Sequence, residues 1–494
     1  MKIFKNPIYA LGIAIFPLQA GVSWLSGSFI FGIGHAERPI IVFLILELVS
    51  FAFYFAAIEW VRRLPLLSFP RKRESSNGSP IKAFGDVKMV LFWIILIGIL
   101  GRLVFLPSNL IQETDPYRYI WDGQTVLAGE NPYKHSPAEA FKNQLAPARN
   151  VTPEIHETFG KINHPGVKTI YPPLAQYLFA VSQTLTPWSF AGWRLMILFA
   201  EIGMFILILR ILMKLGMRKE WLILYAWCPL VIKQFSNSLH LDIFALLFLS
   251  LMVWAFVCDK FRLGFLSLAL ASAVKLFPVV LLPLAFVWVW RIQRKSAFQG
   301  ITIFSLVLLL FYAPFLTAGG GLFEGLARFA GEWRVNESLF SLILHGLVHA
   351  TSLSLFQANL TSRIITAGLI SVCVIGAGVW LGRKQHVTDY FRACFFVIAA
   401  LFFLAPTGNP WYFTWVFPFL YFAPLRSLVI FSGLVFLYYL DFHFSYRSEY
   451  HLFAWVKWIE YGLFYLILTL ELLWNRKSRL FCRWQTNETL SAAR

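Results

Sequence analysis

Charged residues are scarce in this chain. They make up 14% of its 494 residues, apolar residues make up 58%, and phenylalanine alone occurs 50 times. A soluble globular protein carries about a quarter charged residues, so this composition excludes an ordinary soluble enzyme and indicates an integral membrane protein. The formal net charge of +18 does not indicate a nucleic-acid partner. The excess lysine and arginine lie in short loops between apolar runs, where the positive-inside bias of membrane proteins places them.

Cysteine is also rare, and its positions exclude two roles. Of five cysteines, four lie in apolar runs and one lies in the basic C-terminal tail: Cys228, Cys258, Cys373, Cys394 and Cys482. No pair is available to staple the polar segments, and no metal-type spacing occurs. The sequence also has no glycine-rich phosphate loop and no room for a nucleotide-binding fold.

Apolar runs of about 17–25 residues recur from one end of the chain to the other. They are continuous rather than alternating, which predicts helices and not a β-barrel. We therefore predict an all-α polytopic membrane protein with about 12–14 transmembrane helices. The first run begins near Ile8. It lacks a clean cleavage site and leads directly into another run, so we expect a retained helix rather than a signal peptide.

Basic loops predict the orientation of the chain. The segment 62–88 carries seven lysines and arginines against Glu74 and Asp86, which favours a cytoplasmic loop. If the spans alternate, five later basic patches fall on the same side: 214–219, 260–262, 291–295, 383–384 and 476–479. Both termini are then cytoplasmic. A multi-pass protein of the bacterial inner (cytoplasmic) membrane is the localisation that we expect.

The longest polar stretch, 108–191, then lies outside. Within it, 171–185 is apolar. A crossing there would move every later basic loop outside, so we expect a helix that lies along or dips into the outer face. The chain divides into two N-terminal helices with a basic loop (1–88), a catalytic core (89–425), and C-terminal helices with a basic tail (426–494).

Acidic and aromatic residues gather in DPYRYIWDGQTVLAGENPY, residues 115–133. If this segment is helical, Asp115, Tyr119 and Asp122 share one face. Arg118 can then pair with Asp122 at i+4. One carboxylate is structural in that case and the other stays free, and a free carboxylate suits a general base. The alternative is that these are solvated loop charges.

Lys275 interrupts the apolar run LSLALASAVKLFPVVLLPLAF. A lysine at the centre of a membrane helix costs about 2.5–3.5 kcal/mol on insertion scales. If the helix breaks at Lys275 and Pro278, its two arms turn back near the outer face and the ammonium meets a lipid phosphate. The alternative is that the lysine reaches to the headgroups without a role.

His240 and Asp242 open a span directly after the outward turn SNSLH. Such a pair can ligate a metal ion, but two ligands without a third favour a polar cluster at a helix start. We therefore expect no metal and no cofactor.

A family resemblance rests on six stretches, which occur in the order DPYRYIWDGQTVLAGENPY, NHPGVKTIYPPLAQ, NSLHLDIFALL, AVKLFPVVLLP, EWRVNES and GNPWYFTW. The series resembles the polyprenol-phosphate-mannose-dependent mannosyltransferases of the GT-C superfamily, close to the bacterial alpha-mannosyltransferase branch. The resemblance implies many transmembrane helices, a long first outward loop with a catalytic aspartate, and a lipid-phosphate-linked sugar as donor. By that resemblance Asp115 takes the family's aspartate, with Asp122 as the alternate because no close Asp-x-Asp pair is present.

The mechanism that the resemblance implies is direct displacement, in which the aspartate deprotonates an acceptor hydroxyl that attacks the anomeric carbon. Lys275 and Arg334 are the candidates for the donor phosphate. The candidates for contacts with the sugar or the acceptor are Arg118, Tyr119, Asn131, Tyr133, His164, Tyr171, His240, Asp242, Asn336, Asn409, Trp411 and Tyr412. The expected partners are a polyprenyl-phosphate sugar, membrane lipids, and a glycan or glycolipid acceptor. The alternative is a transporter or flippase of a lipid-linked sugar, which would show midplane charges and internal repeats of its spans.

Overall fold

The computed structural model describes residues 6–32, 34–63, 80–423 and 425–478. In these residues the chain is helical and contains no β-strand; its one strand-like contact is an isolated bridge between Val335 and Thr407. The predicted all-α polytopic fold is confirmed.

Twenty-three α-helices follow one another in the described chain. The first twelve are α1 (Pro7–Leu25), α2 (Ile40–Arg63), α3 (Pro80–Leu103), α4 (Asp115–Leu127), α5 (Pro137–Lys142), α6 (Pro153–Gly160), α7 (Pro173–Leu185), α8 (Ala191–Lys214), α9 (Ile223–Ala226), α10 (Pro229–Ile232), α11 (Asp242–Val257) and α12 (Phe261–Val274). The others are α13 (Leu282–Ile292), α14 (Arg294–Tyr312), α15 (Gly321–Glu332), α16 (Leu339–Ala350), α17 (Leu355–Leu381), α18 (Val387–Leu404), α19 (Pro410–Phe413), α20 (Phe417–Leu420), α21 (Arg426–Leu434), α22 (Leu440–Ser445) and α23 (Tyr450–Ser478).

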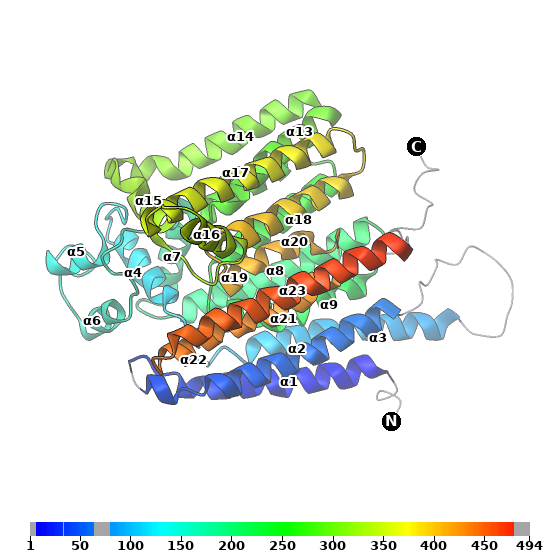
Figure 1. The fold of residues 1–494 in the computed structure, drawn as a ribbon, viewed down its shortest axis with the longest axis horizontal. Helices are drawn as coiled ribbons and strands as arrows, with labels where there is room; N and C mark the ends of the chain where they lie inside the picture. The colour runs from blue at the N-terminus through cyan, green and yellow to red at the C-terminus, as the bar shows by residue number, and fades with distance from the viewer. Residues whose placement is uncertain (1–5, 33, 64–79, 424, 479–494) are drawn as a thin grey trace.

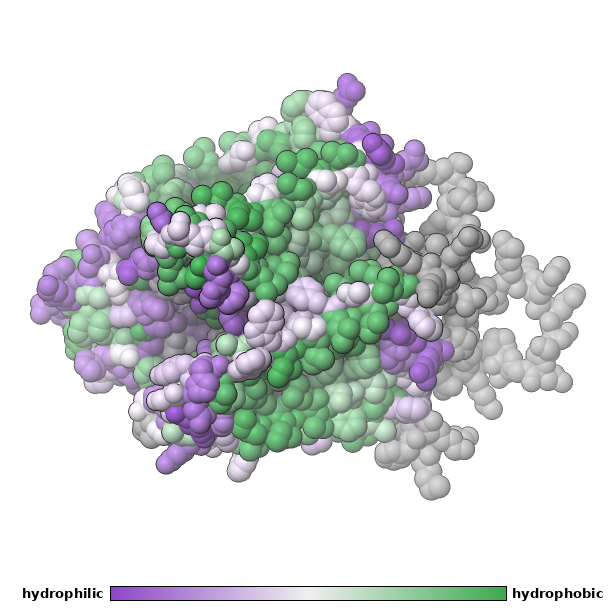
Figure 2. All heavy atoms as spheres, viewed as in Figure 1, coloured by the Kyte–Doolittle hydropathy of each residue, from purple (hydrophilic) through white to green (hydrophobic). Residues whose placement is uncertain are grey.

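Seven helices of the described chain, taken with their short 3-10 extensions, are long and apolar enough to cross a membrane. They are Pro7–Ser28, His35–Arg63, Ala191–Lys214, Arg294–Ala318, Leu355–Leu381, Val387–Leu404 and Arg426–Ser445. Shorter apolar helices lie beside them, among them α11 and α12. Figure 2 shows apolar surface across the middle of the bundle and hydrophilic surface toward its two ends. The chain is a multi-pass membrane protein.

One end of the bundle collects the basic loops. The start of α1 and the end of α23 lie there together (Figure 1). Arg291 donates to the carbonyl of Leu381 at 2.9 Å, which ties two of the predicted cytoplasmic loops, and Arg426 Nε lies 3.2 Å from Glu59 Oε1. Much of the predicted basic loop 62–88 lies outside the described residues, because the description stops at 63 and resumes at 80. We call the end of the bundle that carries these basic loops the basic end.

The opposite end carries α4 to α7, as expected for the segment 108–191 (Figure 1). Helix α7 has 13 residues and begins at Pro173. At 1.5 Å per residue it is about 20 Å long, shorter than the roughly 30 Å hydrocarbon core. It packs against α4 and α8 instead of crossing. A Cβ at Gly123 would meet the carbonyl of Phe179 at 2.7 Å, so only glycine allows this approach of α4 to α7.

Two local features of the fold bear on the site. The predicted break at Lys275 is confirmed, because α12 ends at Val274, Lys275 is extended, and a 3-10 helix follows at Phe277–Leu281. The polar segment between residues 317 and 339 contains a helix, α15. Helix α15 occupies most of it, with Leu322, Leu326 and Phe329 at helical spacing. Helix α15 is an amphipathic surface helix of 12 residues. It is too short to cross a membrane, so the pattern of long apolar runs did not indicate it.

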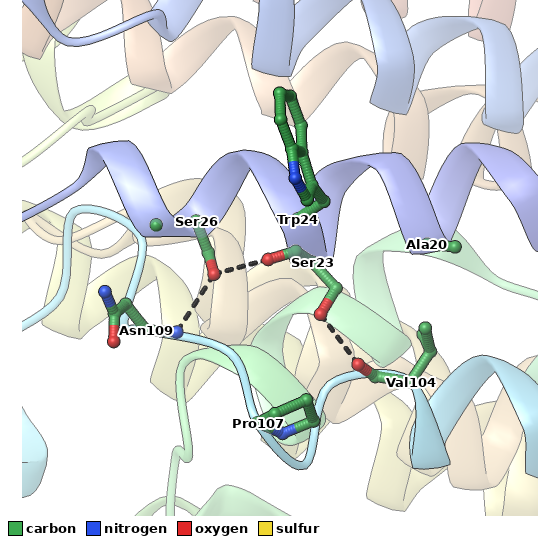
Figure 3. Close-up of a pocket in the computed structure, with 8 residues that line it drawn as sticks. Ala20, Ser23, Trp24, Ser26, Val104, Pro107 and Asn109 are labelled. Carbon is green, nitrogen blue, oxygen red and sulfur yellow. Dashed lines mark hydrogen bonds between the residues drawn. The ribbon is translucent and has the colours of Figure 1, made fainter.

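The N-terminal helices hold the connection between α3 and α4. Ser23 at the end of α1 donates to the carbonyl of Val104 at 2.7 Å, and Ser26 accepts from the backbone N–H of Asn109 at 2.9 Å. Figure 3 shows these contacts in an open cavity of about 400 Å³. Before α2, Arg38 donates to Gln112 Oε1 at 2.6 Å. The first two helices therefore brace the segment that leads into α4.

Candidate active site

The start of α4 is capped by a carboxylate that the sequence analysis did not single out. Glu113 Oε1 accepts from the backbone N–H groups of Thr114, at 2.9 Å, and Asp115, at 3.0 Å. These amides are the unpaired donors of a helix start, where a negative charge is favourable. The capping fixes the Glu113 carboxylate beside the backbone of Asp115.

Asp115 is half-buried and accepts from Asn163 Nδ2 at 3.2 Å. Among the residues that the structure describes, no cationic group lies within ion-pair distance of its carboxylate. Burial first, and then the nearby Glu113, raise the pKa of Asp115 from 3.8 to about 6, against the opposing effects of His240, Asn163 and Lys275. A carboxylate with a pKa near neutrality is suited to accept a proton at physiological pH.

Asp122 differs from Asp115 in having a cationic partner. Arg118 Nε lies 2.7 Å from Asp122 Oδ1, and Arg118 also donates to the carbonyl of Val167 at 2.9 Å. Both side chains are buried, and Gln176 donates to the second carboxylate oxygen at 3.4 Å. The i+4 pairing is the predicted one. Of the two aspartates of α4, Asp115 is therefore the one that has no cationic partner in the described structure.

His240 brings a distant turn against Glu113. Its Nε2 lies 2.9 Å from Glu113 Oε2, and its ring stacks on Trp411 with centroids 4.0 Å apart. Burial alone would raise the pKa of Glu113, but His240, with help from Lys233, lowers it below its usual value. Glu113 is therefore an ionised partner of His240. The Glu-x-Asp spacing of Glu113 and Asp115 is the signal in the sequence that could have indicated it.

Lys275 finds its partner within the protein. Its Nζ lies 2.7 Å from both carboxylate oxygens of Asp242, which is fully buried at the first residue of α11. Trp415 Nε1 donates to the same carboxylate at 2.6 Å. The ammonium also lies over the ring of Tyr412, 4.6 Å from its centroid. The lysine that the sequence assigned to a lipid phosphate is therefore already balanced by one carboxylate, with 15% of its side chain exposed.

Aromatic rings enclose these two ion pairs. Tyr412 stacks on Trp415 at 4.4 Å, and Trp415 stacks on Phe277 at 4.0 Å. On the α4 side, Tyr119 stacks on Phe179 at 4.5 Å. Burial first, and then electrostatic contact with Tyr171 and with the carboxylates Asp115, Asp242 and Glu113, raise the pKa of Tyr119. The charges of the three carboxylates therefore act on one buried hydroxyl. We call Glu113, Asp115, His240, Asp242 and Lys275 the carboxylate cluster.

A second polar group adjoins the cluster through the chain at 406–409. Val335 exchanges two backbone hydrogen bonds with this segment. Its N–H donates to Pro406 O at 3.1 Å, and its carbonyl accepts from Gly408 N–H at 2.7 Å. Asn336 donates to Glu460 Oε1 at 3.0 Å, and buried Asn409 precedes Trp411 and Tyr412 by two and three residues.

The charges of this second group are mostly positive. Arg334 donates to Glu337 Oε1 at 2.5 Å, and Lys457 lies 3.2 Å from Glu337 Oε2. Arg363 is close enough to both Arg334 and Glu337 for their charges to affect it. We call Arg334, Glu337, Arg363 and Lys457 the cationic group.

Four other predicted contact residues lie around the cluster rather than in it. Asn131 donates to the carbonyl of Phe315 at 3.0 Å, and buried Tyr133 donates to the carbonyl of Tyr171 at 2.7 Å. The ring of Tyr171 meets Tyr119 edge-on at 5.2 Å. His164 packs against Trp333 at 4.6 Å, and its neighbour Asn163 makes the contact with Asp115. The structure thus brings together residues from α4, the His240 turn, the end of α12 and α19, at the end opposite the basic end.

His240 and Asp242 point to different partners, Glu113 and Lys275. In the described part of the chain, no group of three histidine, cysteine, aspartate or glutamate side chains is arranged to hold a metal ion.

Comparison with known proteins decides the family. The model of the MptA_B family, described as alpha-(1->6)-mannopyranosyltransferase, N-terminal domain, matches residues 42–292, just over half of the chain. The protein belongs to this mannosyltransferase family. Comparisons with curated proteins and with solved structures each find no match.

The matched range of the mannosyltransferase contains every member of the carboxylate cluster. The aromatic residues Trp411 and Tyr412 and the cationic group lie beyond it. The enzyme is a membrane glycosyltransferase that moves mannose from a sugar donor to an acceptor, and its family domain includes the half of the site that carries the carboxylates.

Proposed function

We propose that this mannosyltransferase, a member of the GT-C type, takes mannose from a polyprenyl-phosphate donor and transfers it to a hydroxyl of a lipid or glycan acceptor. The reaction takes place at the carboxylate cluster, on the outer face of the bacterial cytoplasmic membrane. The observation that carries the proposal is the state of Asp115. Its carboxylate has no ion-pair partner in the described structure, and it lies in a cluster whose other charges are paired.

Asp115 acts as the general base. The acceptor O–H bond breaks as its proton passes to the Asp115 carboxylate, and the oxygen forms a bond to the anomeric carbon while the bond from that carbon to the lipid phosphate breaks. A single displacement of this kind inverts the anomeric configuration. Glu113 is held by His240 and Asp242 by Lys275. The two carboxylates bring negative charge to a centre that becomes oxocarbenium-like as the phosphate leaves.

The donor phosphate needs more positive charge than the cluster offers. Glu113, Asp115 and Asp242 face Lys275 and an imidazole, so acids outnumber the permanent cation. The cationic group has the opposite balance, with three basic side chains around Glu337. We assign the phosphate to the space between Lys275 and Arg334, where Lys275 Nζ still has one N–H beyond the two that face Asp242. The polyprenyl chain then leaves toward the apolar surface.

The donor class is tested with purified protein in liposomes. Radiolabelled polyprenyl-phosphate mannose is supplied to one sample and a mannose nucleotide to another, with a crude glycolipid fraction as acceptor. We expect transfer from the lipid donor, no transfer from the nucleotide, and an unchanged rate in excess chelator, since the proposal gives no step to a metal. Transfer from the nucleotide would contradict the donor assignment, and movement of the lipid-linked sugar across the bilayer without transfer would favour a flippase.

The rate of transfer depends on pH through Asp115. Because its carboxyl must be ionised to accept a proton, we expect kcat/KM to be low below about pH 6 and to level off above it. The fall of kcat/KM below pH 6 reflects the raised pKa of Asp115. An aspartate with the ordinary pKa of 3.8 would leave kcat/KM almost constant across this range. A profile measured from pH 4.5 to 8 checks this. A rate that stays constant down to pH 4.5 would contradict the role of Asp115.

The sidedness of the enzyme is tested by labelling. In a variant without native cysteines, single cysteines are placed as Glu157→Cys on α6 and Asp259→Cys after the end of α11, whose first residue, Asp242, lies in the carboxylate cluster. Both positions are exposed. An impermeant maleimide added to intact cells should label the first and should label the second only after the membrane is opened. The reverse pattern would place the carboxylate cluster in the cytoplasm and contradict the outer-face assignment.

A further inference from the structure

A fully buried lysine lies behind the cluster, near the end of the apolar stretch 221–236. Lys233 has no exposed surface. It begins a π-helical turn, Lys233–Asn237, that follows α10. Such turns are rare, and they occur frequently at functional sites. A buried ammonium is costly to desolvate, so its retention in this segment needs an explanation.

The ammonium joins two segments that both carry residues of the cluster. Lys233 Nζ donates to the carbonyl of Ile111 at 3.1 Å and to Ser238 Oγ at 2.6 Å. Ile111 precedes Glu113 by two residues, and Ser238 precedes His240 by two residues. One side chain thus spans the place where the Glu113 segment meets the His240 turn.

A second residue of the same π-turn holds the same segment. Asn237 Oδ1 accepts from the backbone N–H of Ile111 at 3.1 Å, and its Nδ2 donates to the carbonyl of Asn109 at 2.7 Å. Both polar groups of the Ile111 backbone are therefore engaged by the π-turn. The π-turn places the side chains of Lys233 and Asn237 so that both contact the backbone of the segment 109–111.

The charge of the lysine is not used in an ion pair. Within the described residues no carboxylate lies within salt-bridge distance of its Nζ, and the ring of Tyr439 lies 4.4 Å away. The carboxylates that it affects at longer range are Glu113 and Glu47. The contribution of Lys233 to the site is therefore made through the hydrogen bonds to Ile111 and Ser238.

We propose that Lys233 is a positioning residue for mannosyl transfer. It fixes the segment that carries Glu113 and Asp115 against the turn that carries His240 through its hydrogen bonds to Ile111 and Ser238. This inference rests on the proposed function for its kinetic consequence, but the positioning itself can be measured without substrate.

The test compares Lys233→Met, Lys233→Arg and a matched control, Gln234→Met. Gln234 is the next residue of the same π-turn and is equally buried, but its side chain donates to Tyr439 Oη at 3.1 Å and does not contact Ile111. For Lys233→Met we expect kcat to fall about 100-fold while KM for the lipid donor stays within about 3-fold, because a small displacement of a catalytic group costs this much. Lys233→Arg should recover at least about 10-fold of the loss, and Gln234→Met should stay within about 3-fold of wild type.

Hydrogen exchange supplies the readout that does not depend on the donor. The backbone N–H groups of residues 108–115 should exchange faster in Lys233→Met than in Gln234→Met, provided that the two variants have the same thermal midpoint. Unchanged exchange in Lys233→Met, or equal losses of kcat in the two methionine variants, would overturn the inference. If the wild type transfers nothing from the lipid donor, the proposed function fails, and the exchange data still decide the positioning role.

Discussion

Asp115→Asn lowers kcat of mannosyl transfer by about 10²- to 10⁴-fold and leaves KM for the lipid donor within about 3-fold, the loss expected when a general base is removed. The amide keeps the size of the side chain and can still pair with Asn163, so the fold is unchanged. It cannot accept the proton of the acceptor hydroxyl. Initial rates with radiolabelled polyprenyl-phosphate mannose measure the effect.

The control for this variant is Glu157→Gln on α6, in the same polar segment. Its carboxylate is largely exposed and pairs with Lys161 at 2.6 Å. Wild-type rates are expected there, which shows that the loss belongs to Asp115 and not to the charge of the segment. Transfer by Asp115→Asn within about 5-fold of wild type would remove Asp115 from the role of base.

Lys275→Met destabilises the protein and abolishes transfer. The substitution leaves Asp242 fully buried without a cation, and breaking one partner of a buried ion pair costs about 3–5 kcal/mol. The thermal midpoint in detergent should fall sharply. Lys161→Met, which breaks a partly exposed pair, should change the unfolding free energy by less than about 1 kcal/mol.

The double variant Lys275→Met with Asp242→Asn separates stability from chemistry. It removes both charges of the pair, so most of the lost stability should return. Transfer should remain absent, because the phosphate has lost Lys275 and the cluster has lost one carboxylate. A double variant that regains both stability and transfer would show that the pair only holds the fold.

The membrane explains why so much of the fold could be predicted. Spans must satisfy their backbone internally, so continuous apolar runs sufficed to predict an all-helical membrane protein. The predicted number of spans, about 12–14, is larger than the seven helices of the described chain that are long and apolar enough to cross. The pairing of Arg118 with Asp122 followed from helix geometry alone, and the break at Lys275 followed from the cost of a lysine in an apolar run. These predictions depend on residues close together in the chain.

The rest of the site depends on contacts between distant segments. Lys275 and Asp242 are 33 residues apart, and Lys233 meets a carbonyl 122 residues away. No pattern along the chain reveals that His240 faces Glu113 or that Asn163, rather than His164, contacts Asp115. Lys233 stands at the end of an apolar run, next to Gln234, and not in its middle as Lys275 does, so it gave no signal for a π-turn.

The most direct test of the account is a structure of Asp115→Asn with polyprenyl-phosphate mannose bound, since removal of the base preserves the donor. We expect density for the sugar in the carboxylate cluster, with its anomeric carbon facing the side chain at position 115 across a gap that admits one hydroxyl. The phosphate should lie between Lys275 and Arg334. Density for the lipid phosphate at the basic end, among Arg291 and Lys384, with an empty carboxylate cluster would contradict the account.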